Sequence, residues 1–314
     1  RLAIDILSYS NPYYFGLGGM RGHKYTEKIL KKADLVIALG TSYTHAFAGN
    51  NYNYYNTKAK IIMLNIDSSE LNKPFLNVDL PILENVKVFL VKLNRDKRAN
   101  KIHKKYTEWL KYCRSQKKLL PTCLPSYKKN PINSYFFIEK INNHSNSKDI
   151  FVSDAGSSNY ICSQNLRFKN GQRELTSGAF YSMGMTLPLA IGASITYPDR
   201  RVLAITGDGS IELNIQELQT LSINKLNIKL FIINNGGYAS IRKSQDDMTG
   251  GRYTDDQKIL NFSKIANAFE LPYYFVKDFK KLDKILYKSI NTLGPCLVEV
   301  VCDSNQVIIE THNV

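Results

Sequence analysis

The sequence lacks several features that would point to a particular class of protein. No apolar run approaches the length that a membrane span needs and no signal peptide is visible, so we expect a soluble, cytoplasmic protein with no membrane partner. The five cysteines are scattered and form no Cys-x-x-Cys pair, which predicts free thiols and argues against zinc. The five histidines share no metal-site spacing, and none is assigned a catalytic role.

Acidic residues are scarce relative to basic ones, and the 314-residue chain has a formal net charge of +15. Nucleic-acid binding is one interpretation of such a charge. Much of the excess, however, lies in residues 92–129, a lysine-rich stretch with little hydrophobic patterning at its ends. We therefore favour a solvated linker and predict no nucleic-acid partner, unless salt-dependent binding by residues 95–130 is found. Attraction of anionic substrates is a weaker alternative.

Two polar turns follow buried strands in the second half of the chain. Gly207-Asp208-Gly209-Ser210 follows the apolar run 201–206, and Asn234-Asn235 ends the run 228–233, with helical spacing over 212–225 between them. In a parallel sheet both turns emerge at the carboxyl edge, where ligands bind. A carboxylate and a carboxamide oxygen suit Mg²⁺, and the glycines allow backbone N–H groups to approach a phosphate.

Alternating strands and helices predict an α/β protein with two doubly wound parallel-sheet domains, Rossmann-like and three-layered. We expect a first domain over 1–94, a basic linker with a helix over 95–130, and a second domain over 131–314. The predicted strands are 34–40, 60–67, 150–153, 201–206, 228–233 and 297–301, and the other predicted helices are 25–32, 102–113 and 184–194. The glycine-rich stretch 16–22 does not read Gly-x-Gly-x-x-Gly, so it is not a dinucleotide fingerprint.

The pair of turns resembles the diphosphate and metal motif of thiamine diphosphate enzymes, in the branch of acetolactate synthase, pyruvate oxidase and pyruvate decarboxylase. Residues 19–22, 33–40 and 65–67 resemble the middle domain of the same family. In flavin-containing members this domain holds the ADP part of FAD, and an arginine usually stands two residues after the strand-ending glycine. Ser42 takes that place here, which argues against FAD.

The resemblance implies a set of cofactor and metal ligands. Mg²⁺ would be bound by the side chains of Asp208 and Asn235 and by the backbone carbonyl of Gly237. Met183 would lie beneath the bend between the two rings of thiamine diphosphate, with backbone groups of Tyr181 and Met183 at the aminopyrimidine; core filling is the alternative for a methionine. The implied cofactor-binding set is Ala155, Gly156, Ser157, Ser158, Tyr181, Met183, Gly207, Asp208, Gly209, Ser210, Asn235 and Gly237. The serine pair alone could equally be a helix cap.

The family's catalytic glutamate belongs to an N-terminal pyrimidine-binding domain, and no segment here resembles that domain. No residue of this chain is therefore assigned as certainly catalytic. The chain begins at Arg1 and not at methionine, so we expect it to be a fragment. It begins roughly where the family's middle domain would begin, so the resemblance implies about one further domain before it. Because the family's cofactor spans two subunits, the resemblance implies a homodimer or tetramer and no turnover by this chain alone.

The resemblance implies a 2-oxo acid decarboxylase or carboligase that passes a two-carbon unit from pyruvate, or a similar acid, to a carbonyl acceptor. Acetohydroxyacid synthases carry a tryptophan near the position of Ser244, whereas residues 240–245 look more like relatives from surface-sugar biosynthesis. Arg242 and Gln245 are candidate contacts to such an acceptor, or else exposed helix residues. Acetolactate synthesis proper and simple decarboxylation remain alternatives, and a non-catalytic cofactor-binding scaffold is the alternative from another class.

Overall fold

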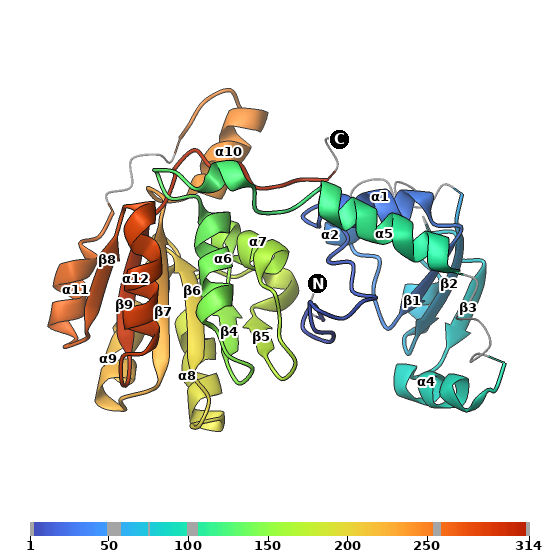
Figure 1. Ribbon diagram of the computed structural model, residues 1–314, viewed down its shortest axis with the longest axis horizontal. Coiled ribbons are helices and arrows are strands. Elements are labelled where there is room, and N and C mark those ends of the chain that lie inside the picture. The colour runs from blue at the N-terminus through green and yellow to red at the C-terminus, as the bar shows by residue number, and fades with distance from the viewer. Residues whose placement is uncertain (1–2, 49–57, 75, 99–105, 254–258, 312–314) are drawn as a thin grey trace. The chain divides into compact units, whose positions relative to one another are not determined.

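The computed structural model describes residues 3–48, 58–74, 76–98, 106–253 and 259–311, and it divides into two compact units (Figure 1). The six-stranded unit comprises Arg1–Tyr14 and Cys123–Ile308, and the three-stranded unit comprises Phe15–Thr122 and Ile309–Val314. Every strand pair in both sheets is parallel. The prediction of an α/β protein with two Rossmann-like sheets is confirmed.

The six-stranded unit has the strand order β5-β4-β6-β7-β9-β8. Its strands are β4 (Ile150–Ser153), β5 (Arg173–Thr176), β6 (Val202–Gly207), β7 (Ile228–Asn234), β8 (Tyr273–Val276) and β9 (Cys296–Val301). Its α-helices are α6 (Ser134–His144), α7 (Gly156–Asn165), α8 (Thr186–Thr196), α9 (Leu218–Ile223), α10 (Ala239–Met248), α11 (Phe262–Ala268) and α12 (Phe279–Ile290). Short 3₁₀ turns lie at Pro125–Tyr127, Gly178–Phe180 and Ile211–Glu217.

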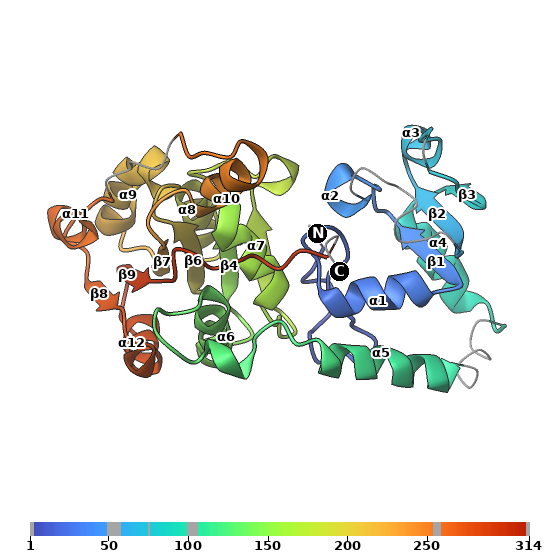
Figure 2. The same ribbon diagram turned by 90° about the horizontal axis from the view of Figure 1, so that it is seen from above.

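Helices cover both faces of this sheet, which explains why its strands are apolar without alternation. In Figure 2, α6 and α12 lie on one side of the strands and α8, α9 and α11 on the other. One face packs into a continuous core that combines alternate residues of β6 and β7 with helix residues, namely Val202, Ala204, Ile228, Leu230 and Ile232 from the strands and Leu187, Leu218 and Phe262 from the helices. On the other face, Phe231 packs against Phe137 of α6 at 5.9 Å between ring centroids.

The direction of winding reverses at β4. From β4 the chain moves outward to β5 on one side and then returns to place β6 on the other side of β4. Loops that leave β4 and β6 at their carboxyl ends therefore diverge, and such a switch point is where open α/β sheets bind ligands. The segments after β4, β6 and β7 carry the two polar turns and the serine pair identified in the sequence.

The helix predicted over 212–225 is the main departure from the expected elements of this unit. The segment forms a 3₁₀ turn over Ile211–Glu217 and a short α-helix, α9. The break lies at Asn214, whose backbone is non-helical (φ −140°, ψ 31°) and whose side chain donates to the carbonyl of Gly184 at 2.8 Å. A tertiary hydrogen bond thus interrupts a segment that has helical spacing.

The three-stranded unit has the order β1-β2-β3, with β1 (Leu35–Leu39), β2 (Lys60–Asn65) and β3 (Leu80–Leu83). Its helices are α1 (Lys24–Lys32), α2 (His45–Ala48), α3 (Ser68–Leu71), α4 (Val86–Arg95) and α5 (Thr107–Leu119). One face of the sheet is covered by a cluster of Ala38, Ile61, Met63, Leu71 and Leu76. No helix within the described ranges is long and apolar enough to cross a membrane.

The ends of the two units differ from the predicted segments 1–94, 95–130 and 131–314. The linker helix runs over Thr107–Leu119 and not 102–113, of which residues 102–105 lie outside the described residues. It packs on α1 through Cys113 and Trp109, within the three-stranded unit. Conversely, the N-terminal residues join the six-stranded unit, where the carboxylate of Asp5 pairs with Arg173 at 2.7 Å. Long-range contacts that local composition does not reveal set these limits.

Candidate functional site

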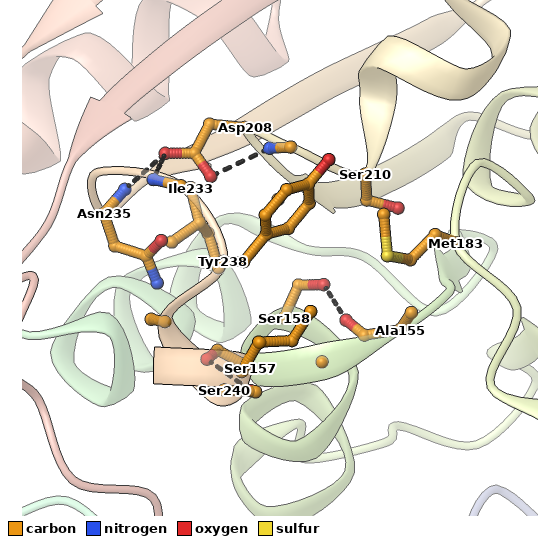
Figure 3. A pocket seen from close by; sticks show the side chains of 16 residues that line it. Ala155, Ser157, Ser158, Met183, Asp208, Ser210, Ile233, Asn235, Tyr238 and Ser240 are labelled. Atoms are coloured by element: carbon orange, nitrogen blue, oxygen red, sulfur yellow. Dashed lines mark hydrogen bonds between the residues drawn. The ribbon is translucent and has the colours of Figure 1, made fainter. Parts of the chain in front are cut away.

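A pocket lies at the carboxyl edge of the six-stranded sheet, at the switch point (Figure 3). It is formed by Gly207 and Ile233 near the ends of β6 and β7, by the segments that follow β4, β6 and β7, and by one residue of the segment before α8. Its empty space, including open solvent at the mouth, is about 470 Å³. The lining residues are Ala155, Gly156, Ser157, Ser158, Met183, Gly207, Asp208, Gly209, Ser210, Ile233, Asn235, Gly237, Tyr238, Ala239, Ser240 and Ile241.

The structure brings Asp208 and Asn235 together, as the sequence predicts. Oδ2 of Asp208 accepts the backbone N–H groups of Asn235 at 3.0 Å and of Gly237 at 2.8 Å, and Oδ1 accepts that of Gly209 at 2.9 Å. These bonds fix the turn after β7 to the turn after β6. The amide of Asn235 extends from that turn into the pocket, and the residue is only 8 % exposed (Figure 3).

The oxygens around Asp208 suit a hard divalent cation. Burial raises the pKa of the Asp208 carboxyl, while the N–H groups that it accepts act in the opposite direction. A cation beside a buried carboxylate favours its ionised form and so offsets the cost of burial. The carbonyl of Gly237 accepts the N–H of Ala239 at 2.8 Å, and a carbonyl oxygen retains a second lone pair. A carboxylate, a carboxamide and this carbonyl form a donor set that Mg²⁺ prefers.

Two glycines of the site are required by its geometry. A Cβ at Gly209 would lie 2.5 Å from the ring of Tyr238, so the ring packs directly on the backbone of the Asp208 turn. Gly237 has φ +96°, a conformation that side chains disfavour. Any larger residue at Gly209 would displace the aromatic ring from the pocket wall.

Asp154 links three segments of the pocket wall, and sequence reasoning did not assign it a role. This fully buried residue accepts the hydroxyl of Ser210 at 2.6 Å, the N–H of Ala155 at 2.7 Å and the N–H of Thr186 at 3.4 Å. Burial raises the pKa of the Asp154 carboxyl, against the effect of these donors. Its place directly after β4 was the only available signal, because its partners lie 32 and 56 residues away.

The predicted aminopyrimidine segment is split between the pocket and its surroundings. Met183 lines the pocket, on the side of Ser210 (Figure 3). Tyr181 does not line it; its ring contacts that of Tyr160 at 6.0 Å between centroids, and its backbone is left-handed with φ 49°. Such a backbone costs free energy in a non-glycine residue, and Lys225 and Glu270 adopt it as well, with φ 48° and 54°.

Arg242 and Gln245 do not line the pocket. The buried guanidinium of Arg242 donates to the carbonyls of Gly236 at 2.6 Å and Asn235 at 3.0 Å, so it holds the turn that carries the predicted metal ligands. Gln245 accepts the N–H of Tyr253 at 3.2 Å. Their neighbours Tyr238, Ser240 and Ile241 form the pocket wall instead, because the first turn of α10 faces the site.

The fold and the pocket together define an α/β protein with a site suited to a ligand that bears phosphate and is bound with a cation. Three wall segments start at strand ends, two of them open α7 and α10, and one carries the oxygen donor set. No group of three His, Cys, Asp or Glu side chains able to hold a metal exists in the part of the chain that is described. A cation here would thus depend on the amide and the backbone carbonyl as well as on Asp208.

The chain belongs to the thiamine pyrophosphate enzymes. Residues 154–300 match the family model described as "Thiamine pyrophosphate enzyme, C-terminal TPP binding domain", and residues 2–93 match "Thiamine pyrophosphate enzyme, central domain". The first match contains every residue that lines the pocket. The predicted family is therefore confirmed, and thiamine diphosphate is the cofactor for which the matching domain is named.

The relatives include acetolactate synthase large subunits. That of Cyanidium caldarium is 30 % identical over 307 residues, which cover 94 % of this chain and 51 % of the relative. Isozyme 1 of Escherichia coli K12 is 29 % identical over 313 residues, covering 98 % and 54 %. The large subunit of Lactococcus lactis is 27 % identical over 311 residues, covering 98 % and 53 %. This chain thus spans about half the length of the relatives that it matches.

Proposed function

We propose that the pocket binds the diphosphate of thiamine diphosphate together with Mg²⁺, as part of an acetolactate synthase-like enzyme. The observation that carries this proposal is the junction of the two turns, in which the Asp208 carboxylate holds the backbone of Asn235 and Gly237. Asp208, Asn235 and the Gly237 carbonyl would hold the metal, and N–H groups at Gly209 and Ser210 would face the diphosphate. Bound thiamine diphosphate supplies a carbanion-stabilising thiazolium for attack on a 2-oxo acid.

The residues of this chain would bind, orient and shield the cofactor. Met183 is an apolar wall residue opposite the metal turn, and it would support the bend between the cofactor rings (Figure 3). Asp154 would keep three wall segments in register through Ser210, Ala155 and Thr186. The pocket contains no side chain assigned to deprotonate the cofactor, so that step is left to the glutamate implied by the family resemblance.

Calorimetry with thiamine diphosphate, with Mg²⁺ or with EDTA, tests the proposal. The wild-type chain should bind only with the metal, and Asp208→Asn should abolish binding because it removes the charged ligand. Asp283→Asn, on the exposed side of α12, is the matched control and should bind like the wild type. Metal-independent binding, or full binding by Asp208→Asn, would contradict the assigned metal site.

The proposal extends to the substrate and the acceptor of the reaction. Acetolactate synthases among the relatives support a 2-oxo acid substrate such as pyruvate, and the 240–245 pattern supports transfer of a two-carbon unit to a sugar-type carbonyl acceptor in surface polysaccharide synthesis. Arg242 holds the metal turn through two of its five N–H donors, so any contact from Arg242 to the acceptor would use the others. We also propose that the whole protein is a homo-oligomer in which a second subunit completes the cofactor site.

Product analysis of the natural full-length protein with pyruvate, with and without a sugar-type aldehyde, tests this part. A product that contains both the two-carbon unit and the aldehyde supports the proposed transfer. Acetolactate as the sole product would show acetolactate synthesis proper, and acetaldehyde alone would show simple decarboxylation. Cofactor binding without release of carbon dioxide would favour the non-catalytic scaffold.

A further inference from the structure

Two side chains hold the backbone of the turn after β7, residues 235–237. Asp208 accepts two of its N–H groups, and Arg242 donates to two of its carbonyls. The third N–H of the turn, that of Gly236, lies 3.4 Å from Oδ1 of Asn234, the last residue of β7. A side-chain oxygen that accepts the N–H two residues further on forms an Asx turn, and this one encloses Asn235. The direction of the Asn234 amide therefore bears on where Asn235 lies.

The nitrogen end of the Asn234 amide is bonded to Glu299 on β9. Nδ2 of Asn234 donates to Oε1 of Glu299 at 2.7 Å. The two side chains lie on the same face of the sheet, because Glu299 is paired with Ile232, two residues before Asn234. An ionised carboxylate can only accept, so Glu299 fixes which end of the amide is nitrogen and leaves the oxygen for Gly236.

Glu299 is a buried acid that does not belong to the pocket. It is 8 % exposed between the fully buried Val298 and Val300, and it is not among the residues that line the pocket. Its other oxygen, Oε2, accepts the hydroxyl of Tyr273 on β8. Burial, and after it the bond to Glu299, raises the pKa of Tyr273, so this hydroxyl remains a donor. A buried carboxylate is costly unless its oxygens are bonded, and here the two bonds hold it against Asn234.

We propose that Glu299 is a positioning residue for the metal site and acts through Asn234. The carboxylate holds the amide of Asn234, which in turn holds the N–H of Gly236. The turn then presents the side chain of Asn235 and the carbonyl of Gly237 at a fixed spacing. This inference rests on the proposed binding of Mg²⁺ in the pocket, and it assigns part of the choice of cation to a residue outside the pocket.

A fixed spacing matters because divalent cations differ in the geometry that they require. Mg²⁺ demands nearly ideal octahedral coordination at short distances, whereas the larger Ca²⁺ accepts more ligands in flexible arrangements. A turn held by Asp208, Arg242 and Asn234 should therefore favour Mg²⁺ over Ca²⁺. Since both ions carry the same charge, a change of charge near the site acts similarly on both, and the ratio of their affinities reports the geometry of the turn.

Removal of either member of the pair should lower this ratio of Mg²⁺ to Ca²⁺ affinity. Glu299→Ala leaves the Asn234 amide without its acceptor, so the Mg²⁺ affinity should fall by about tenfold, as for other partners of metal ligands. The Ca²⁺ affinity should fall by less than about threefold, because Ca²⁺ tolerates a looser turn. Asn234→Ala should have the same effect. The double variant should lose no more than the larger single loss, since Glu299 acts through Asn234.

Exchange of the donor and the acceptor provides a rescue. Asn234→Asp alone sets two carboxylates against each other and should lower the ratio as Glu299→Ala does. Adding Glu299→Gln should restore the ratio to within about twofold of the wild type, because the new amide can donate to the new carboxylate and still accept from Tyr273. The exchanged pair also has the same total charge as the natural pair. A residue needed only for stability would leave the ratio unchanged in every variant that folds.

Calorimetric titration of the 314-residue chain with Mg²⁺ and with Ca²⁺, in excess thiamine diphosphate, measures these affinities. Glu139→Ala on α6, whose carboxylate pairs with Arg167 at 2.9 Å outside the pocket lining, is the matched control and should keep the wild-type ratio. Thermal unfolding without ligand shows which variants fold. Should Glu299→Ala fail to fold, Asn234→Ala and the exchanged pair decide the test.

The outcomes distinguish this inference from the function on which it rests. A lower ratio in the single variants and its recovery in the exchanged pair support the inference. Equal Mg²⁺ and Ca²⁺ affinities in the wild type, an unchanged ratio in the folded variants, or no recovery in the exchanged pair overturn it, while metal-dependent binding of thiamine diphosphate leaves the proposed function standing. Failure of the wild-type chain to bind thiamine diphosphate with either ion overturns both.

Discussion

Strand β7 of the six-stranded sheet and strand β1 of the three-stranded sheet are both apolar parallel strands, yet their surroundings differ. The first six residues of β7 are all buried. In β1, by contrast, Leu35, Ile37 and Leu39 are 45 %, 52 % and 37 % exposed, and Leu80, on the same side of the sheet, is 49 % exposed. We call these four residues the open face. Parallel sheets are ordinarily covered on both faces.

This difference shows that an apolar strand predicts a buried position but does not show which other elements cover the strand. The six-stranded unit supplies helices for both faces of its own sheet and carries the pocket at its centre. The three-stranded unit covers one face with the cluster around Met63, whereas the open face and much of α4 expose apolar side chains. Stability and the cofactor site should therefore depend mainly on the six-stranded unit.

The largest test of this comparison replaces Phe231, which is fully buried in β7 against Phe137. Phe231→Ala should lower the free energy of unfolding by about 3–5 kcal/mol, because it removes a buried ring and leaves a cavity. Ile37→Ala on the open face should cost less than about 0.5 kcal/mol, as surface substitutions usually do. Urea unfolding followed by circular dichroism measures both. Equal costs would mean that the open face is buried in solution.

A second test separates the wall of the pocket from its fold. Arg242→Ala removes two donors to the metal turn and should weaken Mg²⁺ binding, measured at saturating thiamine diphosphate, by about tenfold or more, or ~1.4 kcal/mol. Arg242→Lys should lose less, since an ammonium group retains one donor contact. Lys243→Ala, which removes only a surface ion pair with Asp247, is the control. An unchanged Mg²⁺ affinity in Arg242→Ala would show that the turn keeps its shape unaided.

A smaller effect comes from charge and not from packing. The pKa of Asp283 on α12 is lowered, first by a hydrogen bond from Lys140 of α6 and also by His144. Because the folded pKa lies below the ordinary value of 3.8, this stabilisation is present above that pH and is lost as the pH falls through the folded pKa. At pH 7, Asp283→Asn should lower the free energy of unfolding by less than about 1 kcal/mol, as for other exposed ion pairs. It should have no effect at a pH low enough for the Asp283 carboxyl to be protonated in both the folded and the unfolded state. Unfolding at pH 7 and at low pH measures this, and a cost that stays constant with pH would argue against the ion pair.

The smallest expected change in stability comes from the open face itself. Ile37→Thr combined with Leu39→Thr introduces a residue that strands tolerate at both positions. The double variant should change the free energy of unfolding by less than about 0.5 kcal/mol per site. Binding of a dye that reports exposed apolar surface should nevertheless fall, because two exposed side chains become polar. Unchanged dye binding would locate the exposed apolar surface elsewhere on the protein.

Features that depend on short stretches of sequence could be predicted. The buried strands, the turn at Asp208, the turn at Asn235 and the serine loop after β4 all follow from apolar runs that end in polar or small residues. Parallel pairing then requires that these turns meet at one edge, so the pocket was predictable together with most of its lining. This prediction needs only the order of apolar and polar residues along the chain, and not the tertiary contacts of each side chain.

Features that depend on distant partners could not be predicted. The helical spacing over 212–225 gave no sign that Asn214 would bond to Gly184, 30 residues away, and break the helix. Asp154 resembled an ordinary turn residue until its bond to Ser210 was visible. For Arg242 the sequence left open an acceptor contact or an exposed helix residue, and it did not show that the side chain is buried against Gly236 and Asn235, because position on a helix does not show which way a long side chain turns. In each case a tertiary hydrogen bond, and not local preference, decided the outcome.

The switch point at β4 has a consequence for the order of events during folding. The pocket wall needs β4, β6 and β7 side by side, although about 80 residues separate the first from the last, so its closure must await contacts of long sequence separation. Partly folded chains that contain only neighbouring elements would have no site at all. A ligand of this pocket would consequently stabilise only the completed sheet, by about 2.7 kcal/mol at a free ligand concentration of a hundred times its Kd. It would therefore oppose unfolding of the six-stranded unit in particular.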